Sequence, residues 1–215
     1  KNKDYVDMIL SDPSTLKTYY MGTVDANNKA NFYDGKVRVV DPKGNESMKF
    51  DAHDYLNVIE EHVEPWGYVK YPYLKKVGWK GLVDGPASGV YRVGPLGRLN
   101  ASEGMATPMA QQEYERMYET LGGKPVHSTL AFHWARLIEL LYAAERALEL
   151  SRDKEITSKE VRNTPGAPGE GVGIVEAARG TLIHHYKLDE EALVKSVNLI
   201  VATTNNHPAI CMSIR

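Results

Sequence analysis

Residues 171–191, GVGIVEAARGTLIHHYKLDEE, place an acidic and a basic side chain among glycines and apolar residues. Glu176 and Arg179 stand three residues apart, with Val175 before them and Leu182 after them. A guanidinium carries a fixed fork of N–H donors and stays protonated, so an arginine in apolar surroundings holds an anion rather than acting as a base. The residues leave two alternatives equally open: Arg179 binds an anionic group, or it pairs internally with Glu176.

The composition is that of a globular protein. The 215 residues include 42% hydrophobic and 25% charged residues, a single cysteine and a formal net charge of −2. These values exclude a disordered chain, a collagen repeat, a disulfide-stapled secreted domain and a strongly basic nucleic-acid binder. No apolar run approaches the ~20 residues of a membrane span. We therefore expect a cytoplasmic protein with neither nucleic acid nor a membrane as partner.

The first half of the chain favours strands. Residues 31–50, NFYDGKVRVVDPKGNESMKF, predict a three-stranded meander with a two-residue turn at Asp34-Gly35 and a longer turn at residues 42–45. A helix is predicted from Asp51 or Asp54 to about residue 64. Residues 65–106 alternate aromatic residues with Gly and Pro, which indicates packed loops and short strands rather than regular helices.

The second half favours helices. Thr107 is placed to cap a helix that starts at Pro108 and ends at Gly122-Gly123. The strongest helix spans about residues 129–152, where apolar residues recur at three- and four-residue steps on more than one stripe, as expected for a helix between layers. A last helix is predicted from about Asp189.

These elements predict an α+β fold with a β-meander-rich N-terminal portion and long central helices. Residues 1–90 form a β-rich portion with one helix, and residues 91–215 form a helical core with a Gly-rich segment, within one domain. The chain begins without Met and stops directly after an apolar stretch, so we expect a fragment of a larger chain.

Three other features indicate structural rather than catalytic or ligand-binding roles. The GEGVG stretch at 169–173 lacks the Gly-Lys-Ser/Thr of a Walker loop and the spacing of a dinucleotide fingerprint, so it indicates tight backbone approach. None of the seven histidines has metal-ligand spacing; His133 is expected in the core or an interface, and His184 and His185 on opposite faces of an extended segment. Cys211 is expected to be an inert small hydrophobe.

Four ordered blocks resemble one family, the large (catalytic) subunit of nickel–iron hydrogenases. The phrase EAARGTLIHHY at 176–186 resembles the family's E-A-P-R-G-x-L-x-H motif. YRVGPLGRLN at 91–100 resembles its Y-x-V-G-P-L-A-R segment, FHWARLIELLYAAE at 132–145 its long central helix, and NLIVATTNN at 198–206 its V-P-[ST]-T segment. The segment RGTLIHHY at 179–186 is most similar to the sequences of the cytoplasmic, cofactor-coupled or heterodisulfide-reductase-associated (methyl-viologen-reducing) branch of the family.

The resemblance implies a Ni-Fe(CN)2(CO) centre held by two cysteine pairs, an N-terminal C-x-x-C and a C-terminal D-P-C-x-x-C. This sequence has neither pair, so it is expected to supply no metal ligand. By similarity Arg179 is the catalytic arginine over the open nickel position, in contact with an iron-bound cyanide, and Thr203 donates to the other cyanide. The outer shell of the centre would comprise Ala178, Leu182, Val201, Ala202 and Thr203.

Two of these residues depart from the family pattern, because Ala178 and Ala202 stand where the motifs have Pro. An alanine loosens the backbone restriction that a proline imposes. The assignment also requires Arg179 to lie close to the threonine pair near the end of the chain.

The implied activity of the intact protein is reversible heterolytic oxidation of H2. Electrons would pass to further electron-transfer subunits by way of an iron–sulfur small subunit. The fragment alone is expected to be inactive and free of metal. Two rival interpretations remain: a ligand-free scaffold similar to the quinone-side subunit of respiratory complex I, and a stand-alone binding module in which Arg179 grips a small anion.

Overall fold

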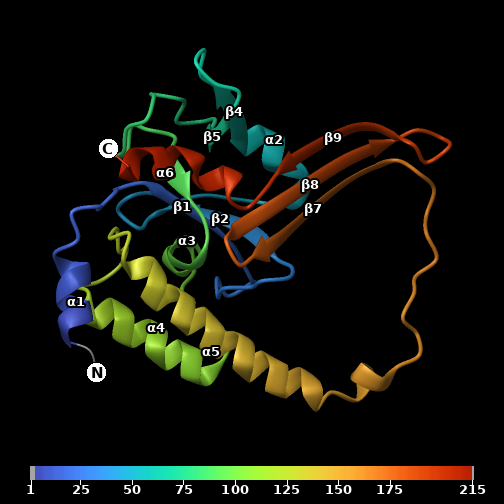
Figure 1. The fold of residues 1–215 in the computed structure, drawn as a ribbon. Helices are drawn as coiled ribbons and strands as arrows, with labels where there is room; N and C mark the ends of the chain where they lie inside the picture. Colours follow the sequence, from blue (N-terminus) through green and yellow to red (C-terminus); the bar gives the residue numbers. More distant parts are fainter. Residues whose placement is uncertain (1–2, 215) are drawn as a thin grey trace.

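The structure, a computed structural model, describes residues 3–214, and its first sheet organises the fold (Figure 1). The sheet has the order β3-β2-β1-β6. β1 pairs antiparallel with β2 and parallel with β6, and every residue of β1 is buried. The strands are β1 (Tyr19–Val24), β2 (Lys36–Val40), β3 (Glu46–Phe50) and β6 (Tyr91–Arg92).

The predicted meander exists, but its first strand was placed wrongly. That strand is β1, and residues 25–35 connect it to β2, so Asp34-Gly35 does not form a two-residue hairpin turn. β1 is buried along its whole length and therefore lacks the polar alternation that marks a half-exposed strand. The longer turn at 42–45 is confirmed, where the Asp41 carboxylate accepts hydrogen bonds from the backbone of Lys43 and Asn45.

The helix predicted over 51–64 is wrong for most of its length. A 3-10 turn, η1 (Ala52–Asp54), and the single-turn α2 (Tyr55–Val58) lead directly into β4 (Ile59–Val63). β4 pairs antiparallel with β5 (Lys70–Leu74), so Ile59 lies opposite Leu74 in the ladder. Cross-strand pairing with a segment eleven residues or so downstream outweighs the local helical spacing.

Residues 65–106 contain the predicted loops and short strands, but also a helix that was missed. α3 (Pro95–Ala101) has all seven of its residues buried. A helix buried on every side shows no amphipathic pattern, so its sequence carries little helical signal. Gly94 precedes it at φ +90°, a conformation that favours glycine, and Pro95 opens its first turn.

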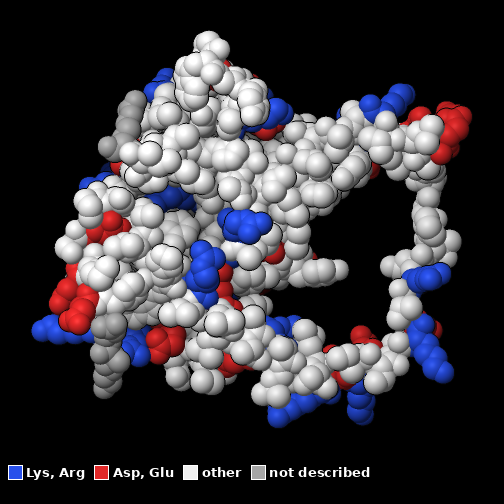
Figure 2. Space-filling view, viewed as in Figure 1, with Lys and Arg blue, Asp and Glu red and all other residues white. Residues whose placement is uncertain are grey.

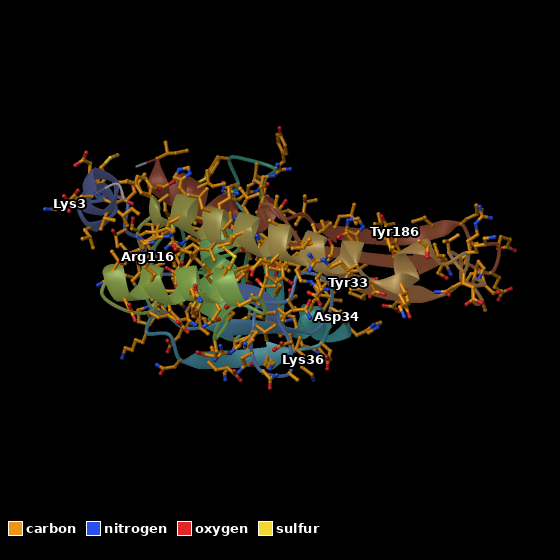
Figure 3. The ribbon with its side chains drawn as sticks, turned by 90° about the horizontal axis from the view of Figure 1, so that it is seen from below. Lys3, Tyr33, Asp34, Lys36, Arg116 and Tyr186 are labelled. Carbon is orange, nitrogen blue, oxygen red and sulfur yellow. The ribbon has the colours of Figure 1, made fainter. Side chains whose placement is uncertain are left out.

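Two predicted helices are confirmed within a few residues: α4 (Pro108–Thr120), preceded by Thr107, and α5 (Ala131–Ser151). They lie side by side under α3, with α1 (Lys3–Leu10) at one end (Figures 1 and 3). The expectation that α5 lies between layers is not met within the described residues. Leu137 and Leu140 are 62% and 65% exposed, so one face of the helix is open.

The last part of the chain is a sheet where a helix was predicted. β7 (Glu170–Ala177), β8 (Gly180–Leu188) and β9 (Val194–Ile200) form an antiparallel sheet, followed by η3 (Thr204–Asn206) and α6 (His207–Ser213). The Asp189 carboxylate accepts hydrogen bonds from the backbone of Glu191 and Leu193, which makes a turn of the predicted helix start. Residues 158–169, after η2 (Lys154–Thr157), arch around an open window (Figure 2).

Hydrophobic contacts and strand pairing connect residues before position 90 with residues after it. β6 extends the sheet begun by β1, and the cluster around Tyr55 and Tyr91 also contains Ile183 and Ile200. A second cluster joins Ile9 to Leu96, Met117 and Ile138. In residues 3–214 we find no helix with the length and hydropathy of a membrane span. On the face seen in Figure 2, acidic and basic side chains are interspersed.

A polar network around Arg92 ties the beginning of the chain to the segment before α5. The Arg92 guanidinium donates to the Leu16 carbonyl at 2.6 Å, to the Tyr20 hydroxyl at 2.7 Å and to the His127 carbonyl at 2.9 Å. The Tyr20 hydroxyl lies 2.7 Å from His127 Nδ1. Burial, and then the charge of Arg92, lower the pKa of His127 to about 4.

We predict that the free energy of unfolding of the chain falls as pH decreases from about 6.5 toward about 4. In that window the His127 imidazole is protonated in the unfolded state but stays neutral in the folded state, because its pKa is lower in the folded state. Falling pH therefore stabilises the unfolded state. Urea titrations across the window should show a decline that His127→Gln reduces. The matched variant His133→Gln, at an exposed position of α5, should keep the wild-type decline. Equal pH profiles for wild type and His127→Gln would contradict the prediction.

Candidate functional site

Arg179 lies in the tight turn between β7 and β8, where Ala177 pairs with Gly180. Gly180 has φ +136°, and a Cβ at this position would lie 2.1 Å from Val93 Cγ2, so the turn tolerates only glycine there. The side chains of Ala178 and Arg179 are exposed in the described chain. The expectation that apolar neighbours surround Arg179 is therefore wrong, because those neighbours belong to the strands and the arginine belongs to the turn that projects from them.

Glu176 pairs with Arg98 rather than with Arg179. Its Oε2 lies 2.7 Å from Arg98 Nη1, and its side chain is fully buried. Its Oε1 accepts hydrogen bonds from the Thr23 backbone N–H and the Thr181 hydroxyl, both at 2.9 Å. The internal Glu176–Arg179 pair is thus excluded by geometry, which leaves the Arg179 guanidinium available.

The Arg98 guanidinium is bound by two carboxylates from distant segments. Besides Glu176 on β7, it binds Glu139 on α5 through two parallel hydrogen bonds, Nε–Oε1 at 2.6 Å and Nη2–Oε2 at 2.7 Å. Nη1 also donates to the Ala177 carbonyl at 2.8 Å. Burial by itself would lower the pKa of Arg98, but the hydrogen bonds and charges of Glu139 and Glu176 raise it above its ordinary value, so the group stays charged.

The segment after β9 lies beside the Arg179 turn. Asn206 Nδ2 donates to the Arg179 carbonyl at 3.4 Å, and Asn205 Nδ2 donates to the Thr181 carbonyl at 2.8 Å. Thr203 is half-buried two residues before Asn205, Val201 is 46% exposed and Ala202 is buried. Leu182 is half-buried on β8. The turn and the threonine segment, more than twenty residues apart in the chain, are therefore neighbours.

The side-chain donors on these two neighbouring segments are unused within the described chain. Among residues 3–214, the Arg179 guanidinium and the Thr203 hydroxyl make no hydrogen bond or ion pair with another side chain or the backbone. One donor is cationic and the other neutral, and the exposed part of Val201 adds an apolar surface. Such a donor set suits an anionic acceptor that has an apolar flank.

Metal ligands are not assembled here. The described residues contain no group of three or more His, Cys, Asp or Glu side chains placed to hold a metal ion. Cys211 is a free, half-buried thiol whose Sγ lies 3.9 Å from the Tyr71 hydroxyl. His184 and His185 alternate across β8 as predicted, and the buried His185 binds Tyr55 at 2.8 Å and Glu170 at 2.7 Å. His133 is exposed on α5 rather than in the core.

The GEGVG stretch does not show the predicted tight backbone approach. It leads into β7 and forms the first residues of that strand. Cβ atoms built at Gly169, Gly171 and Gly173 would meet nothing within 4 Å. Close approaches occur instead at glycines elsewhere in the chain, among them Gly180 and Gly94, where a Cβ would lie 3.0 Å from the Arg179 carbonyl oxygen.

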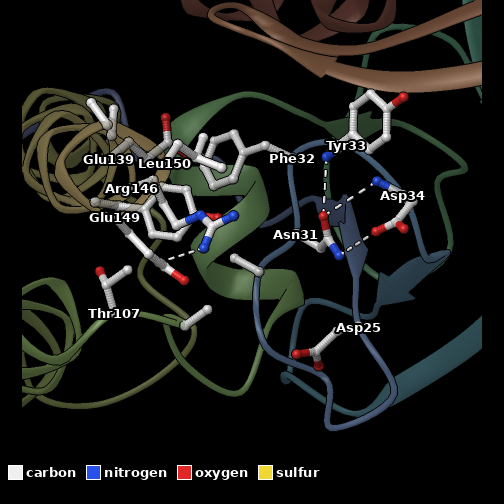
Figure 4. A pocket seen from close by; sticks show the side chains of 15 residues that line it. Asp25, Asn31, Phe32, Tyr33, Asp34, Thr107, Glu139, Arg146, Glu149 and Leu150 are labelled. Atoms are coloured by element: carbon white, nitrogen blue, oxygen red, sulfur yellow. Dashed lines mark hydrogen bonds and ion pairs between the residues drawn. The ribbon is translucent and has the colours of Figure 1, made fainter. Parts of the chain in front are cut away.

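A cavity of about 870 Å³ lies between α5 and the connection from β1 to β2 (Figure 4). Phe32 and Tyr142 stack in it with ring centroids 4.9 Å apart, and Arg146 pairs with Glu149 on its helical wall. The Asn31 side chain accepts from the Tyr33 backbone, which orders the opposite wall. Neither Arg179 nor Thr203 lines this cavity, so it is separate from the candidate site.

The sequence did not predict the residues that support the Arg179 turn and the threonine segment. Arg98, Glu139, Asn205 and Asn206 lie within the motif blocks, but the sequence assigned no role to them. Two signals in the sequence point to the charged members: an arginine inside the seven-residue stretch that became α3, and a glutamate between Ile138 and Leu140 in an apolar helix. A charged residue in such a position needs a buried partner.

A family model described as nickel-dependent hydrogenase matches residues 8–211. The chain belongs to the nickel-dependent hydrogenase family, which confirms the resemblance to nickel–iron hydrogenase large subunits. It is 52% identical over its whole length to an iron-sulfur subunit of the F420-non-reducing hydrogenase of Archaeoglobus profundus, and covers 44% of that protein. It is 40% identical to the NAD-reducing hydrogenase HoxS subunit beta of Cupriavidus necator, and covers 42% of it.

Solved structures support the fold class. A crystal structure of an NAD+-reducing NiFe-hydrogenase in the H2-reduced state superposes on the whole chain with a TM-score of 0.87 at 34% identity, and the chain covers 45% of it. A NiFeSe hydrogenase variant from Desulfovibrio vulgaris Hildenborough matches with a TM-score of 0.66 at 20% identity, which supports the fold alone. The chain spans less than half the length of these relatives.

We predict that Arg98→Met lowers the free energy of unfolding by about 3–5 kcal/mol, because two buried carboxylates lose their counter-charge. The substitution keeps a side chain of comparable length, so loss of packing is small. Denaturant unfolding of the chain measures the effect. The control Arg116→Met removes an exposed arginine that pairs with Glu113 on α4, and should cost no more than about 1 kcal/mol. Equal losses in the two variants would argue against a central role for Arg98.

Proposed function

We propose that the whole protein to which these residues belong is the catalytic subunit of a nickel–iron hydrogenase. Its reaction is the reversible heterolytic oxidation of H2, with electrons passed to further electron-transfer subunits by way of an iron–sulfur small subunit. The proposal is supported by membership of the family and by one feature of the structure. That feature is the juxtaposition of the Arg179 turn with the threonine segment that ends in Asn206.

The residues present fit the outer shell of a Ni-Fe(CN)2(CO) centre. Cyanide ligands are anionic hydrogen-bond acceptors, and the unpaired guanidinium of Arg179 and hydroxyl of Thr203 are the matching donors. The carbonyl ligand is a poor acceptor, which suits the apolar surface of Val201, with Ala202 and Leu182 beside it. Ala178, next to Arg179 in the turn, completes the proposed set.

When bound, the centre supplies the metal ions that polarise H2 and accept its electrons. In this proposal the Arg179 guanidinium provides a fixed positive charge that stabilises the separation of proton and hydride. The hydroxyl of Thr203 provides a neutral donor, and the apolar side chains exclude water. Donors held in place before the reaction need no reorganisation during it, which is why a rigid turn suits this role.

The buried network holds the turn from beneath. Arg98 binds both the Glu176 carboxylate and the Ala177 carbonyl, the residues that lead into the turn. The arginine of α3 therefore fixes the end of β7, and Arg179 projects from a supported position. In the proposed enzyme Arg98 is a structural support and does not touch the reacting atoms.

The ligands of the metals lie, in this proposal, outside residues 1–215. The described residues contain no ligand cluster, and the one thiol, Cys211, is not assigned as a ligand. We also propose that the whole enzyme acts in the cytoplasm, as expected from the sequence.

The first test is Arg179→Lys in the whole hydrogenase complex. A lysine keeps the positive charge but loses the planar fork of donors, so we expect nickel and iron contents to remain and H2-dependent turnover to fall about a hundredfold. Turnover is measured with an artificial electron acceptor, and metal content by elemental analysis. Arg152→Lys, at an exposed position just after α5, is the matched control and should turn over as wild type. Wild-type turnover in Arg179→Lys would remove the role proposed for that residue.

A second test uses the 215-residue chain by itself. Because its described residues hold no ligand cluster, we expect the purified chain to contain no stoichiometric nickel or iron and to show no H2-dependent turnover. Elemental analysis by mass spectrometry checks this. One nickel per chain that survives chelation would show that these residues hold a metal, contrary to the proposal.

A further inference from the structure

The side chain of Asn206 joins three backbone groups that belong to two segments. Its Oδ1 accepts from the Val93 backbone N–H at 2.9 Å, and its Nδ2 faces the Val93 carbonyl and the Arg179 carbonyl, each at 3.4 Å. A carboxamide has one acceptor and one double donor, so all its groups are used here and its orientation is set by the Val93 N–H. Asn206 thus links the end of β6 to the Arg179 turn.

The backbones of the two segments lie close together at this point. Gly94 and Gly180 bring the two backbones together, since a Cβ at Gly94 would lie 3.0 Å from the Arg179 oxygen and one at Gly180 would lie 2.9 Å from the Gly94 nitrogen. The amide of Asn206 then closes the contact by hydrogen bonds. The two glycines permit the approach, and the asparagine holds it.

Asn205, the residue before Asn206, also links β6 to the residues that follow the Arg179 turn. The Tyr91 hydroxyl donates to its Oδ1 at 2.5 Å, and its Nδ2 donates to the Thr181 carbonyl at 2.8 Å. Asn205 is fully buried. The consecutive asparagines therefore contact β6 and the residue after it on one hand, and the carbonyls of Arg179 and Thr181 on the other, two and three residues after Thr203.

We propose that Asn206 is a positioning residue that sets the place of Arg179 relative to Thr203. This inference rests on the proposed function, in which the two side chains donate to the two cyanide ligands of one centre. Asn206 acts through the Arg179 backbone and touches neither substrate nor metal. Loss of its Nδ2 donor frees the turn to shift away from the threonine segment.

The test is Asn206→Asp in the whole hydrogenase complex. The aspartate has nearly the same shape and still accepts from Val93, but it offers oxygen where the two carbonyls need a donor. We expect wild-type nickel and iron contents, faster hydrogen–deuterium exchange in the peptide spanning residues 177–182, and shifted infrared stretching bands of the cyanide ligands. The kcat should fall about tenfold with little change in KM, as for a misplaced group. Asn27→Asp, at an exposed turn, is the control and should leave every readout unchanged.

The outcomes separate this inference from the function on which it rests. Faster exchange with shifted bands supports the positioning role. Unchanged hydrogen–deuterium exchange would show that Asn206 does not hold the Arg179 turn, and would overturn the inference. Faster exchange with unchanged cyanide bands and unchanged kcat would show a purely structural contact, and would overturn the positioning role. Hydrogen–deuterium exchange does not depend on catalysis. Wild-type turnover in Arg179→Lys would therefore count against the proposed function, while the exchange result for Asn206→Asp would still decide whether Asn206 holds the Arg179 turn.

Discussion

The charge of Arg98 is the constraint on which the rest of the structure depends. Its side chain is 1% exposed, and an unpaired guanidinium in such a place would be very unfavourable. The N–H donors of this one guanidinium are bound by Glu139 from α5 and by Glu176 from β7, so segments separated by about forty residues each must meet at one point. The α3 backbone is equally constrained, because a Cβ at Gly22 on β1 would lie 2.8 Å from the Arg98 Cα.

This arrangement explains how an exposed arginine can have a defined position. The β7–β8 turn is held below by Arg98, through Glu176 and the Ala177 carbonyl, and beside it by Asn206 and Gly94. The far end of the same sheet has no comparable support, since Leu193 and Val194 are 65% and 59% exposed. The proposed donors therefore lie at the supported end of the sheet, where a positional requirement can be met.

The sequence predicted elements well where the chain contacts itself locally. α4 follows from Pro108 at its start and the glycines after its end, and α5 from its three- and four-residue spacing, although the predicted cap Thr107 makes no side-chain hydrogen bond to the α4 backbone and donates to Glu145 instead. The β2–β3 turn follows from Asp41 and the residues after it. The predictions failed where pairing with distant segments decides the conformation. β4 is a strand because β5 pairs with it, and β9 is a strand because β8 does. α3 was missed because a fully buried helix has no polar face.

The sequence by itself determined the family and the lack of cysteine pairs, because these depend on residue identity and order alone. Only the tertiary structure decided that Glu176 belongs to Arg98, that Arg179 is exposed, and that Asn206 connects its turn to β6. The physical reason is that a buried charge selects its partner by position in space. Glu176 is three residues from Arg179 in the chain, but its carboxylate lies on the inner face of β7, where the guanidinium of Arg98 is 2.7 Å away.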